Sequence, residues 1–169
     1  MKLLAEIRES DLEGISPSPH VEQYRVRRAV RAIIFDEEGN TVLSHVAKGD
    51  YWKIPGGGIE EGESIEEALE REAMEEAGVE IEIGDPIGVI IEYRDAWEQL
   101  QISYCYHARV VGEKKVPEYD EGEREKRFSS HWMPYQEALK YCNVNVSDKI
   151  YEAKFMQTRD GIFMRNIQL

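Results

Sequence analysis

The sequence has few of the features that mark secreted, membrane-spanning or zinc-binding proteins. Among its 169 residues are only two cysteines, Cys105 and Cys142, which are far apart and lack the paired spacing of a metal site. No apolar run approaches the roughly 20 residues that span a bilayer, and the N-terminus turns acidic at once, unlike a secretory signal. The four histidines also lack zinc-site spacing. These absences favour a cytoplasmic protein with reduced thiols and no membrane partner.

Basic charge is scarce as well. The formal net charge is −13 and the sequence pI is about 4.8. A polymer of nucleic acid is bound by a basic face, so this balance argues against DNA or RNA as a partner. It does not exclude a small nucleotide, because a bound metal ion can invert the local field. The acidic residues are concentrated, with nine glutamates against one arginine between Glu60 and Glu76.

Length and composition predict one domain preceded by a short leader. A chain of this size, with 41% hydrophobic residues, suits a single core. Residues 1–20 end in the proline-containing segment SPSPH and are expected to form a leader, with the domain over 21–169. The leader is expected either to pair as an edge strand or to cover a dimer face, and the sequence does not decide between these.

The apolar pattern predicts mostly antiparallel strands with helices between and after them. A hairpin is expected from 24–35 and 41–46, and the turn at 95–99 is expected to join two later strands as a second hairpin. The expected later elements are strands over 79–83, 87–93 and 100–111, a charged loop over 112–126, a strand over 128–133, a helix opened by Pro134 to about 141, and a helix capped by Ser147 to about 158. This order predicts an α+β fold.

One helix is marked more clearly than the others, and it follows the glycine-rich loop 48–58. Ser64 stands at the N-cap position with Glu67 three residues later, which is a capping-box pattern, and Gly78 is placed to end the helix. Its apolar stripe consists of Ile65, Leu69, Ala73 and Ala77.

Three carboxylates share another face of this predicted helix. At 100° per residue, Glu72, Glu75 and Glu76 fall within an arc of about 100°. Like charges held this close repel one another unless a positive charge lies among them. A hard divalent cation, Mg²⁺ or Mn²⁺, suits oxygen ligands and commonly serves phosphate chemistry. The spacing therefore predicts a metal site with these three glutamates as ligands.

The segment from Gly57 to Val79 resembles the complete Nudix box of the Nudix (MutT-like) hydrolases. The matching residues are Gly57, Glu63, Arg71, Glu72, Glu75, Glu76 and Gly78, with Ala73 and Val79 at the two apolar positions. The resemblance implies the Nudix fold, a mixed β-sheet sandwiched between α-helices (α/β/α), with the box as a loop–helix–loop. It also implies divalent-metal-dependent cleavage of the diphosphate linkage in a nucleoside diphosphate derivative, and a homodimer is a fair expectation.

The resemblance also implies roles for individual residues. The carbonyl of Gly57 is expected to join the metal ligands, and Arg71 is expected to pair with Glu63 and orient the carboxylates. The general base stays open between the box residues Glu72 and Glu75 and the loop residues Glu121 and Glu123.

Substrate signals are weaker. Trp52 and Tyr93 are candidates for stacking on a base, and Lys53 for contacting a phosphate. Tyr51, Trp97, Phe128 and Trp132 are further aromatic candidates. The downstream markers of the other Nudix subgroups are absent, which favours a (deoxy)nucleoside triphosphate, including damaged ones. The alternatives are an ADP-ribose or nucleotide-sugar pyrophosphatase and, from another class, a non-catalytic nucleotide-sensing Nudix domain.

Overall fold

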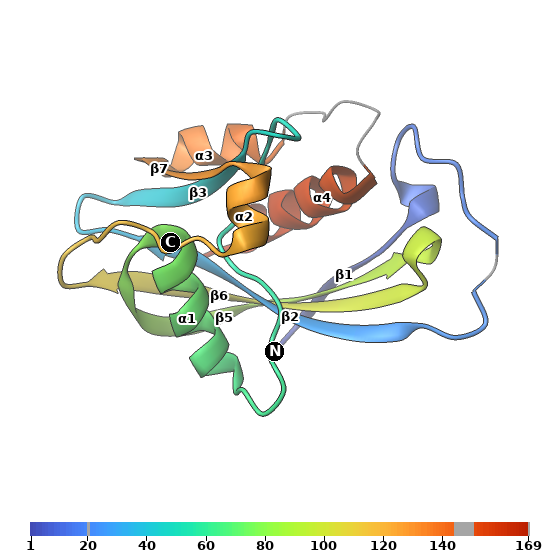
Figure 1. Ribbon diagram of the computed structural model, residues 1–169, viewed down its shortest axis with the longest axis horizontal. Coiled ribbons are helices and arrows are strands. Elements are labelled where there is room, and N and C mark those ends of the chain that lie inside the picture. Colours follow the sequence, from blue (N-terminus) through green and yellow to red (C-terminus); the bar gives the residue numbers. More distant parts are fainter. Residues whose placement is uncertain (20, 144–150, 169) are drawn as a thin grey trace.

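The strands of the protein pair into one mixed sheet with helices on both of its faces (Figure 1). The computed structural model describes residues 1–19, 21–143 and 151–168. The strands are β1 (Leu3–Arg8), β2 (Arg25–Phe35), β3 (Asn40–Val46), β4 (Tyr51–Lys53), β5 (Glu80–Arg94), β6 (Gln99–Val111) and β7 (Phe128–Pro134). The helices are α1 (Ile65–Ala77), α2 (Glu121–Lys126), α3 (Tyr135–Tyr141) and α4 (Tyr151–Asn166), with 3-10 turns η1 (Glu9–Asp11) and η2 (Asp95–Trp97). The predicted α+β class is confirmed.

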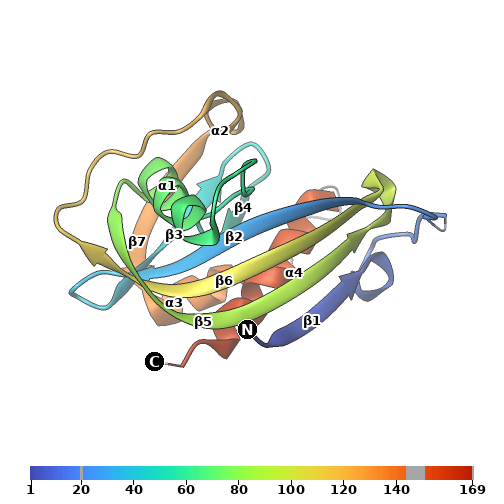
Figure 2. The same cartoon turned by 90° about the horizontal axis from the view of Figure 1, so that it is seen from below.

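The sheet has the strand order β1-β5-β6-β2-β3-β4, and β7 pairs with β3 outside this path. The pairs β1/β5 and β2/β6 are parallel and the other pairs are antiparallel. Figure 2 shows β1, β5, β6 and β2 side by side. The leader therefore contributes an edge strand, the first of the two alternatives, while the division into a leader and a domain stays a prediction.

Alternation along β2 supplies the two hydrophobic cores. Val30, Ala32 and Ile34 pack with the small residues of α1 on one face of the sheet. Ile33 points to the other face, where it packs with residues of α3 and α4 such as Ala138 and Phe155. Because successive side chains of a strand point to opposite faces, one strand serves both layers. The three-layer arrangement follows from this pattern.

The predicted hairpin of β2 and β3 is paired only next to its turn. Phe35 and Thr41 are partners, and beyond them the two strands separate. The glycine-rich segment 55–59 takes the place of β3 along the edge of β2. The Val30 amide donates to the Gly57 carbonyl over 2.9 Å, and the Ala32 amide donates to the Pro55 carbonyl over 3.1 Å. Because the strands separate, the loop hydrogen-bonds to the edge of β2 and lies next to α1.

Several element boundaries differ from the expectations. The stretch 112–126 is not all loop, because it ends in α2, whose cap Asp120 accepts from the Glu123 amide. Strand β5 runs through Pro86 with a shifted register instead of stopping there. Pro134 is the N-cap of α3 and not its first residue. Helix α4 continues to Asn166, and the proposed cap Ser147 lies outside the described residues.

None of the described helices combines the length and the apolar character that crossing a bilayer requires.

Candidate metal and phosphate site

The glycine loop is held tightly between β2 and α1. Gly56 has φ +136°, and a Cβ at this position would lie 2.2 Å from the Val30 carbonyl oxygen. A Cβ on Gly57 would lie 2.2 Å from Oε1 of Glu72. The Gly56 contact is with backbone, so the close approach of the loop to β2 requires glycine there. The Gly57 contact is with the end of the Glu72 side chain, which would have to move if a Cβ were added.

Helix α1 carries the carboxylates, and its ends are those the sequence predicts. The Ser64 side chain accepts from the Glu67 amide, the Glu67 side chain accepts from the Ser64 amide, and Gly78 has φ +67°. The expected stripe packs against the sheet, with Leu69 and Ala73 buried and Ile65 partly buried. Packing of this stripe fixes the rotation of the helix, so its carboxylate face turns toward the glycine loop.

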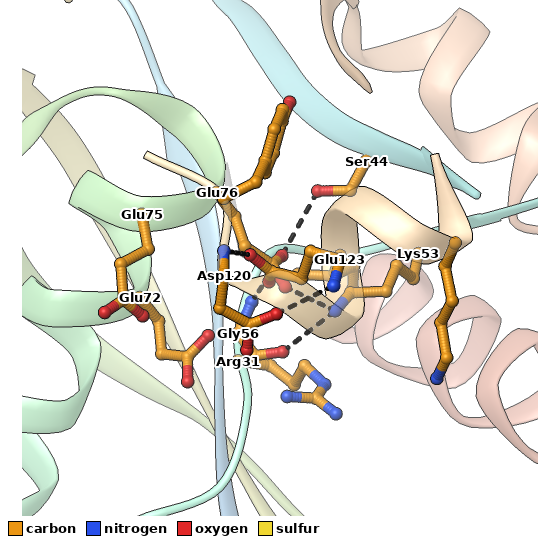
Figure 3. A network of polar contacts seen from close by, with 12 residues as sticks. Arg31, Ser44, Lys53, Gly56, Glu72, Glu75, Glu76, Asp120 and Glu123 are labelled. Carbon is orange, nitrogen blue, oxygen red and sulfur yellow. Dashed lines mark hydrogen bonds and ion pairs between the residues drawn. The ribbon is translucent and has the colours of Figure 1, made fainter. Parts of the chain in front are cut away.

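Glu76 is the most enclosed of these carboxylates, with 1% of its surface exposed. Its Oε1 lies 2.6 Å from Nζ of Lys53, and its Oε2 accepts from the Gly56 amide over 3.1 Å and from the Ser44 hydroxyl over 3.2 Å. The Lys53 ammonium also donates to the Gly56 carbonyl over 3.1 Å. Figure 3 shows these contacts converging on Glu76. A cationic group thus stands between the buried carboxylate and a loop carbonyl.

Three carboxylates meet beside Lys53, and one of them comes from outside α1. One oxygen each of Glu72, Glu76 and Glu123 lie within 4.8 Å of one another. Burial and then the charge of Glu76 raise the pKa of Glu72. Burial, together with the hydrogen bond and the charge of Glu76, raises the pKa of Glu123 to about 8. Lys53 therefore does not fully compensate the negative charge of this cluster, which is an electrostatic reason for it to accept a cation.

Arg71 joins the carboxylates of the helix to the loop. Its Nε donates to Oε1 of Glu63 over 2.8 Å and its Nη2 donates to Oε2 over 3.1 Å, which is a bidentate pair. Its Nη1 donates to Oε1 of Glu72 over 2.8 Å and to Oε2 of Glu75 over 2.9 Å. The hydrogen bond to Arg71 lowers the pKa of Glu63, and the hydrogen bond to Glu63 raises the pKa of Arg71. The arginine therefore fixes the orientation of both α1 carboxylates.

These groups line a cleft of about 630 Å³. Part of its lining is the glycine loop, the α1 carboxylates, Lys53 and Glu123. A second part, here called the arginine end, consists of polar side chains of β2, β5 and β6, which are Arg27, Arg31, Arg94, Gln99 and Gln101. Tyr51, Trp97 and Phe128 supply the aromatic part of the lining. A cleft lined by both carboxylates and arginines suits a ligand that carries several charges.

The sequence model of the NUDIX domain family matches residues 25–154, which is more than half of the chain. The chain belongs to the NUDIX family. An RNA pyrophosphohydrolase of Wolbachia pipientis subsp. Culex pipiens is 33% identical over 96 residues, covering 56% of this chain and 58% of that protein. An RNA pyrophosphohydrolase of Campylobacter jejuni is 39% identical over 77 residues, covering 46% of this chain and 41% of that protein. The chain thus spans about half the length of the curated relatives that it matches.

Solved structures confirm the Nudix fold. The MutT NUDIX hydrolase from Burkholderia pseudomallei has a TM-score of 0.61 at 20% identity, covering 85% of this chain and 99% of that chain. The Ap4A hydrolase of C. elegans has a TM-score of 0.57 at 16% identity, covering 84% of this chain and 96% of that chain. At these identities the similarity establishes the fold alone.

Within this Nudix domain, the predicted ligands take two different positions. Glu72 and Glu76 enter the cluster, while Glu75 lies at the edge of the cleft with its Oε2 bonded to Arg71. The Gly57 carbonyl accepts from the Val30 amide, whereas the Gly56 carbonyl faces the Lys53 ammonium beside Glu76. The Gly57 carbonyl as backbone ligand stays a prediction.

The predicted substrate contacts also need correction. Lys53 lines the cleft, but among the described residues of the lining Trp52 and Tyr93 are absent. Trp52 stacks on His45 and contacts Tyr141, and Tyr93 packs under Arg8. Strand alternation is the reason, because the neighbours Tyr51, Lys53 and Arg94 line the cleft, and the side chains next to them in each strand point the other way.

The sequence alone does not identify two parts of the cleft, which are the loop acid Glu123 and the arginine end. Glu123 belongs to the cluster, while Glu121 is exposed on the same short helix. The capping pattern Asp120-x-x-Glu123 is a signal for α2 that was available in the sequence. The arginine end was not predicted at all. Its signal is the alternation of polar residues in strands that are otherwise apolar, such as Gln99, Gln101 and Ser103 in β6.

Proposed function

We propose that this Nudix protein is a hydrolase that cleaves a phosphoanhydride bond of a nucleoside diphosphate derivative, with a nucleoside triphosphate, damaged ones included, as its substrate. The observation that carries the proposal is the cluster of Glu72, Glu76 and Glu123 in a polar cleft, beside a loop whose close approach to β2 requires glycine at Gly56. Water attacks a phosphorus atom, the bridging P–O bond breaks, and a nucleoside monophosphate and pyrophosphate leave.

The cluster fits Mg²⁺ or Mn²⁺. Its donors are carboxylate oxygens and one loop carbonyl, which hard cations prefer. Burial, and after it the charge of Glu76, raise the pKa of Glu72, so a cation bound there would stabilise its charged form. Glu72, Glu75, Glu76 and the Gly57 carbonyl would hold the ion. When bound, it supplies positive charge that neutralises phosphate oxygens during the attack.

The residues of the chain have separate tasks in this reaction. Arg71 holds Glu72 and Glu75 in fixed orientations through its two Nη1 bonds. Lys53 compensates the buried charge of Glu76. Glu123 accepts the proton of the attacking water, since it lines the cleft beside the α1 carboxylates. Glu121, exposed and outside the cluster, is the less suitable of the two loop acids.

The names of the relatives favour a second candidate substrate. The Wolbachia and Campylobacter relatives are named RNA pyrophosphohydrolases, which points to a triphosphate at the 5′ end of an RNA. The net charge of −13 argues against extended contact with a polymer, so we place the free nucleotide first. ADP-ribose and nucleotide sugars are the remaining alternatives, and a nucleotide-sensing domain is the alternative without catalysis. A homodimer stays a prediction.

A substrate panel separates these alternatives. Product release is measured with Mg²⁺ for dNTPs, oxidised dGTP, ADP-ribose, nucleotide sugars, dinucleoside polyphosphates and a 5′-triphosphorylated oligoribonucleotide. We expect the highest kcat/KM for a nucleoside triphosphate. A higher value for the oligoribonucleotide would favour RNA 5′ ends, and a higher value for ADP-ribose would favour the sugar-linked class. Tight nucleotide binding without turnover of any substrate would contradict the enzyme and favour the sensor.

A further inference from the structure

The arginine end of the cleft is built by strand register. In β2, Arg27 is the partner of Gln101 in β6, and Gln101 is in turn the partner of Glu92 in β5. One step along, Gln99 is the partner of Arg94. These side chains share the sheet face that packs against α4. A row of polar side chains thus extends from the hydrophobic core to the cleft. At such buried positions aliphatic side chains are more usual.

Positive charge is in excess at this end. The guanidiniums of Arg27, Arg31, Arg94 and Arg159 lie around two fully buried carboxylates, Glu92 and Asp160. The ion pairs that use these acids are Arg94–Glu92 at 2.9 Å, Arg159–Glu92 at 3.5 Å and Arg159–Asp160 at 2.7 Å. The acids are thus shared by Arg94 and Arg159, and neither forms a described ion pair with Arg27 or Arg31.

The arginines that line the cleft also have unused donors. Arg27 donates to Gln101 over 2.7 Å, Arg31 to the Val30 carbonyl over 2.6 Å, and Arg94 to Glu92 over 2.9 Å. Among the described residues these are their only hydrogen-bond acceptors, although a guanidinium has five N–H donors. The Nε atoms of Arg31 and Arg94 are buried without any hydrogen-bond partner in the part of the chain that is described. Native structures rarely leave such donors unsatisfied.

Electrostatic effects on the arginines agree with this geometry. Burial and the nearby charges of Arg94 and Arg159 lower the pKa of Arg27. Burial and the charge of Arg159 lower the pKa of Arg31 to about 10. Both directions reflect guanidiniums that repel one another in a poorly solvated place. An anion bound among them would relieve the repulsion and accept the free N–H groups.

We propose that the arginine end is an oxyanion subsite, which holds a phosphate or carboxylate group of the substrate that lies beyond the anhydride being cleaved. This rests on the proposed function only in its reference to the substrate, because the subsite itself is defined by Arg27, Arg31 and Arg94. A neutral base or sugar would leave the excess charge uncompensated. The subsite therefore selects ligands with an anionic group on the far side of the diphosphate, and a terminal phosphate of a nucleoside triphosphate fits this description.

The subsite can be tested without metal or catalysis. Binding of inorganic pyrophosphate is measured by calorimetry in EDTA at fixed ionic strength, together with the shift in melting temperature. Arg27→Gln is the test variant, since Arg27 is only half-buried and glutamine keeps a donor for Gln101. Arg28→Gln is the matched control, because Arg28 is exposed on the opposite face of the same strand. We expect wild type to bind, Arg27→Gln to lose at least tenfold in affinity, and Arg28→Gln to change less than twofold.

Three results would overturn the subsite: no anion binding by wild type in EDTA, equal losses in both variants, or unchanged affinity in a folded Arg27→Gln protein. If Arg27→Gln does not fold, Arg27→Lys replaces it, with a smaller loss of affinity expected because the charge is retained. The subsite would be contradicted if folded Arg27→Lys bound pyrophosphate with the affinity of wild type and the affinity of wild type did not change with salt concentration. A protein that binds pyrophosphate through Arg27 but hydrolyses nothing in the panel would contradict the proposed function and leave the subsite intact.

Matched ligands identify the oxyanion. ATP and UDP-glucuronate carry an anionic group beyond a diphosphate, whereas ADP-ribose and UDP-glucose end in neutral groups. A preference for ATP over ADP-ribose that Arg27→Gln abolishes assigns the subsite to phosphate. The same result for UDP-glucuronate over UDP-glucose assigns it to carboxylate. If Arg27→Gln weakens all four ligands equally, the subsite does not read the far group and the proposal fails.

Discussion

Lys53 and Glu76 form an ion pair that is almost fully enclosed by the protein. Nζ of Lys53 lies 2.6 Å from Oε1 of Glu76, and the two residues are 5% and 1% exposed. The same ammonium donates to the Gly56 carbonyl, so it links strand β4, the glycine loop and helix α1. In the absence of a divalent cation, Lys53 is the positive charge in direct contact with the buried Glu76 carboxylate.

Lys53→Met should therefore destabilise the metal-free protein strongly. Removing one partner of a buried pair leaves an uncompensated charge, at a cost of about 3–5 kcal/mol. Mg²⁺ should restore more stability to this variant than to wild type, because it replaces the lost positive charge. Urea denaturation with EDTA or Mg²⁺ measures both effects. Lys114→Met, which removes a more exposed pair with Asp36, is the control and should cost about 0–1 kcal/mol. Equal stabilities of Lys53→Met and wild type in EDTA would contradict the role of Lys53.

The raised pKa of Glu123 predicts a pH dependence of stability. With a folded-state pKa of about 8 against an ordinary value of 4.5, the folded state binds the extra proton between these two values. The contribution is complete below about pH 4.5 and is lost as pH rises through about 8. In EDTA the melting temperature should carry a component that falls from pH 5 to pH 8. Glu123→Gln should remove this component and Glu121→Gln should retain it. If wild type lacks the component, or if Glu123→Gln still shows it, Glu123 is not its source.

Arg71→Lys should impair catalysis more than folding. Lysine keeps the charge but cannot hold Glu63 in a bidentate pair while also bonding Glu72 and Glu75. Loss of an orienting partner typically costs 10–100-fold in metal affinity or activity, and we expect a decrease of that size in kcat/KM. Mg²⁺ titrations of activity and melting curves measure the two effects. Arg109→Lys, at an exposed position on β6, is the control. Unchanged kinetics in Arg71→Lys would mean that the hydrogen bonds do not orient the carboxylates.

The two loop glycines should differ in their response to alanine. At Gly57 the new Cβ meets the flexible carboxylate of Glu72, which can move at the expense of its position in the cluster. At Gly56 the Cβ meets the backbone of β2, and φ is positive, so the strand itself must shift. We expect Gly57→Ala to lower the affinity for Mg²⁺ with only a modest loss of stability. We expect Gly56→Ala to destabilise the fold by several kcal/mol. Gly122→Ala has no comparable clash and serves as the control for thermal melts. The reverse order of stabilities would be inconsistent with the described loop.

The sequence allowed α1 and its carboxylates to be predicted because their signals are local. Ser64, Glu67 and Gly78 mark the ends of the helix, and the spacing of its apolar residues sets the rotation. The partners that convert this face into a site are distant. Lys53 reaches Glu76 from β4, which pairs with β3 where β3 has separated from β2. Glu123 reaches Glu76 from α2, a short charged helix within a segment whose composition is typical of a loop.

The arginine end shows why distant pairing limits prediction from sequence. Arg27 and Gln101 face each other only because β2 and β6 are parallel, and this register depends on the whole sheet. The charged residues at the start of β2 can be read from the sequence, but the residues of other strands that face them cannot. The assignments of Trp52 and Tyr93 failed for a simpler reason. Both residues are aromatic, but strand alternation turns their side chains away from the cleft.

We propose that the carboxylate cluster around Glu76 makes this chain a divalent-metal-dependent phosphoanhydride hydrolase. The most direct test is the rate of nucleoside triphosphate hydrolysis by wild type and Glu76→Gln, with Mg²⁺ and with excess EDTA, on proteins matched by circular dichroism and melting temperature. We predict turnover by wild type with Mg²⁺ alone, and a decrease of at least 100-fold in folded Glu76→Gln. Turnover that persists in EDTA, or that survives in Glu76→Gln, would contradict the claim.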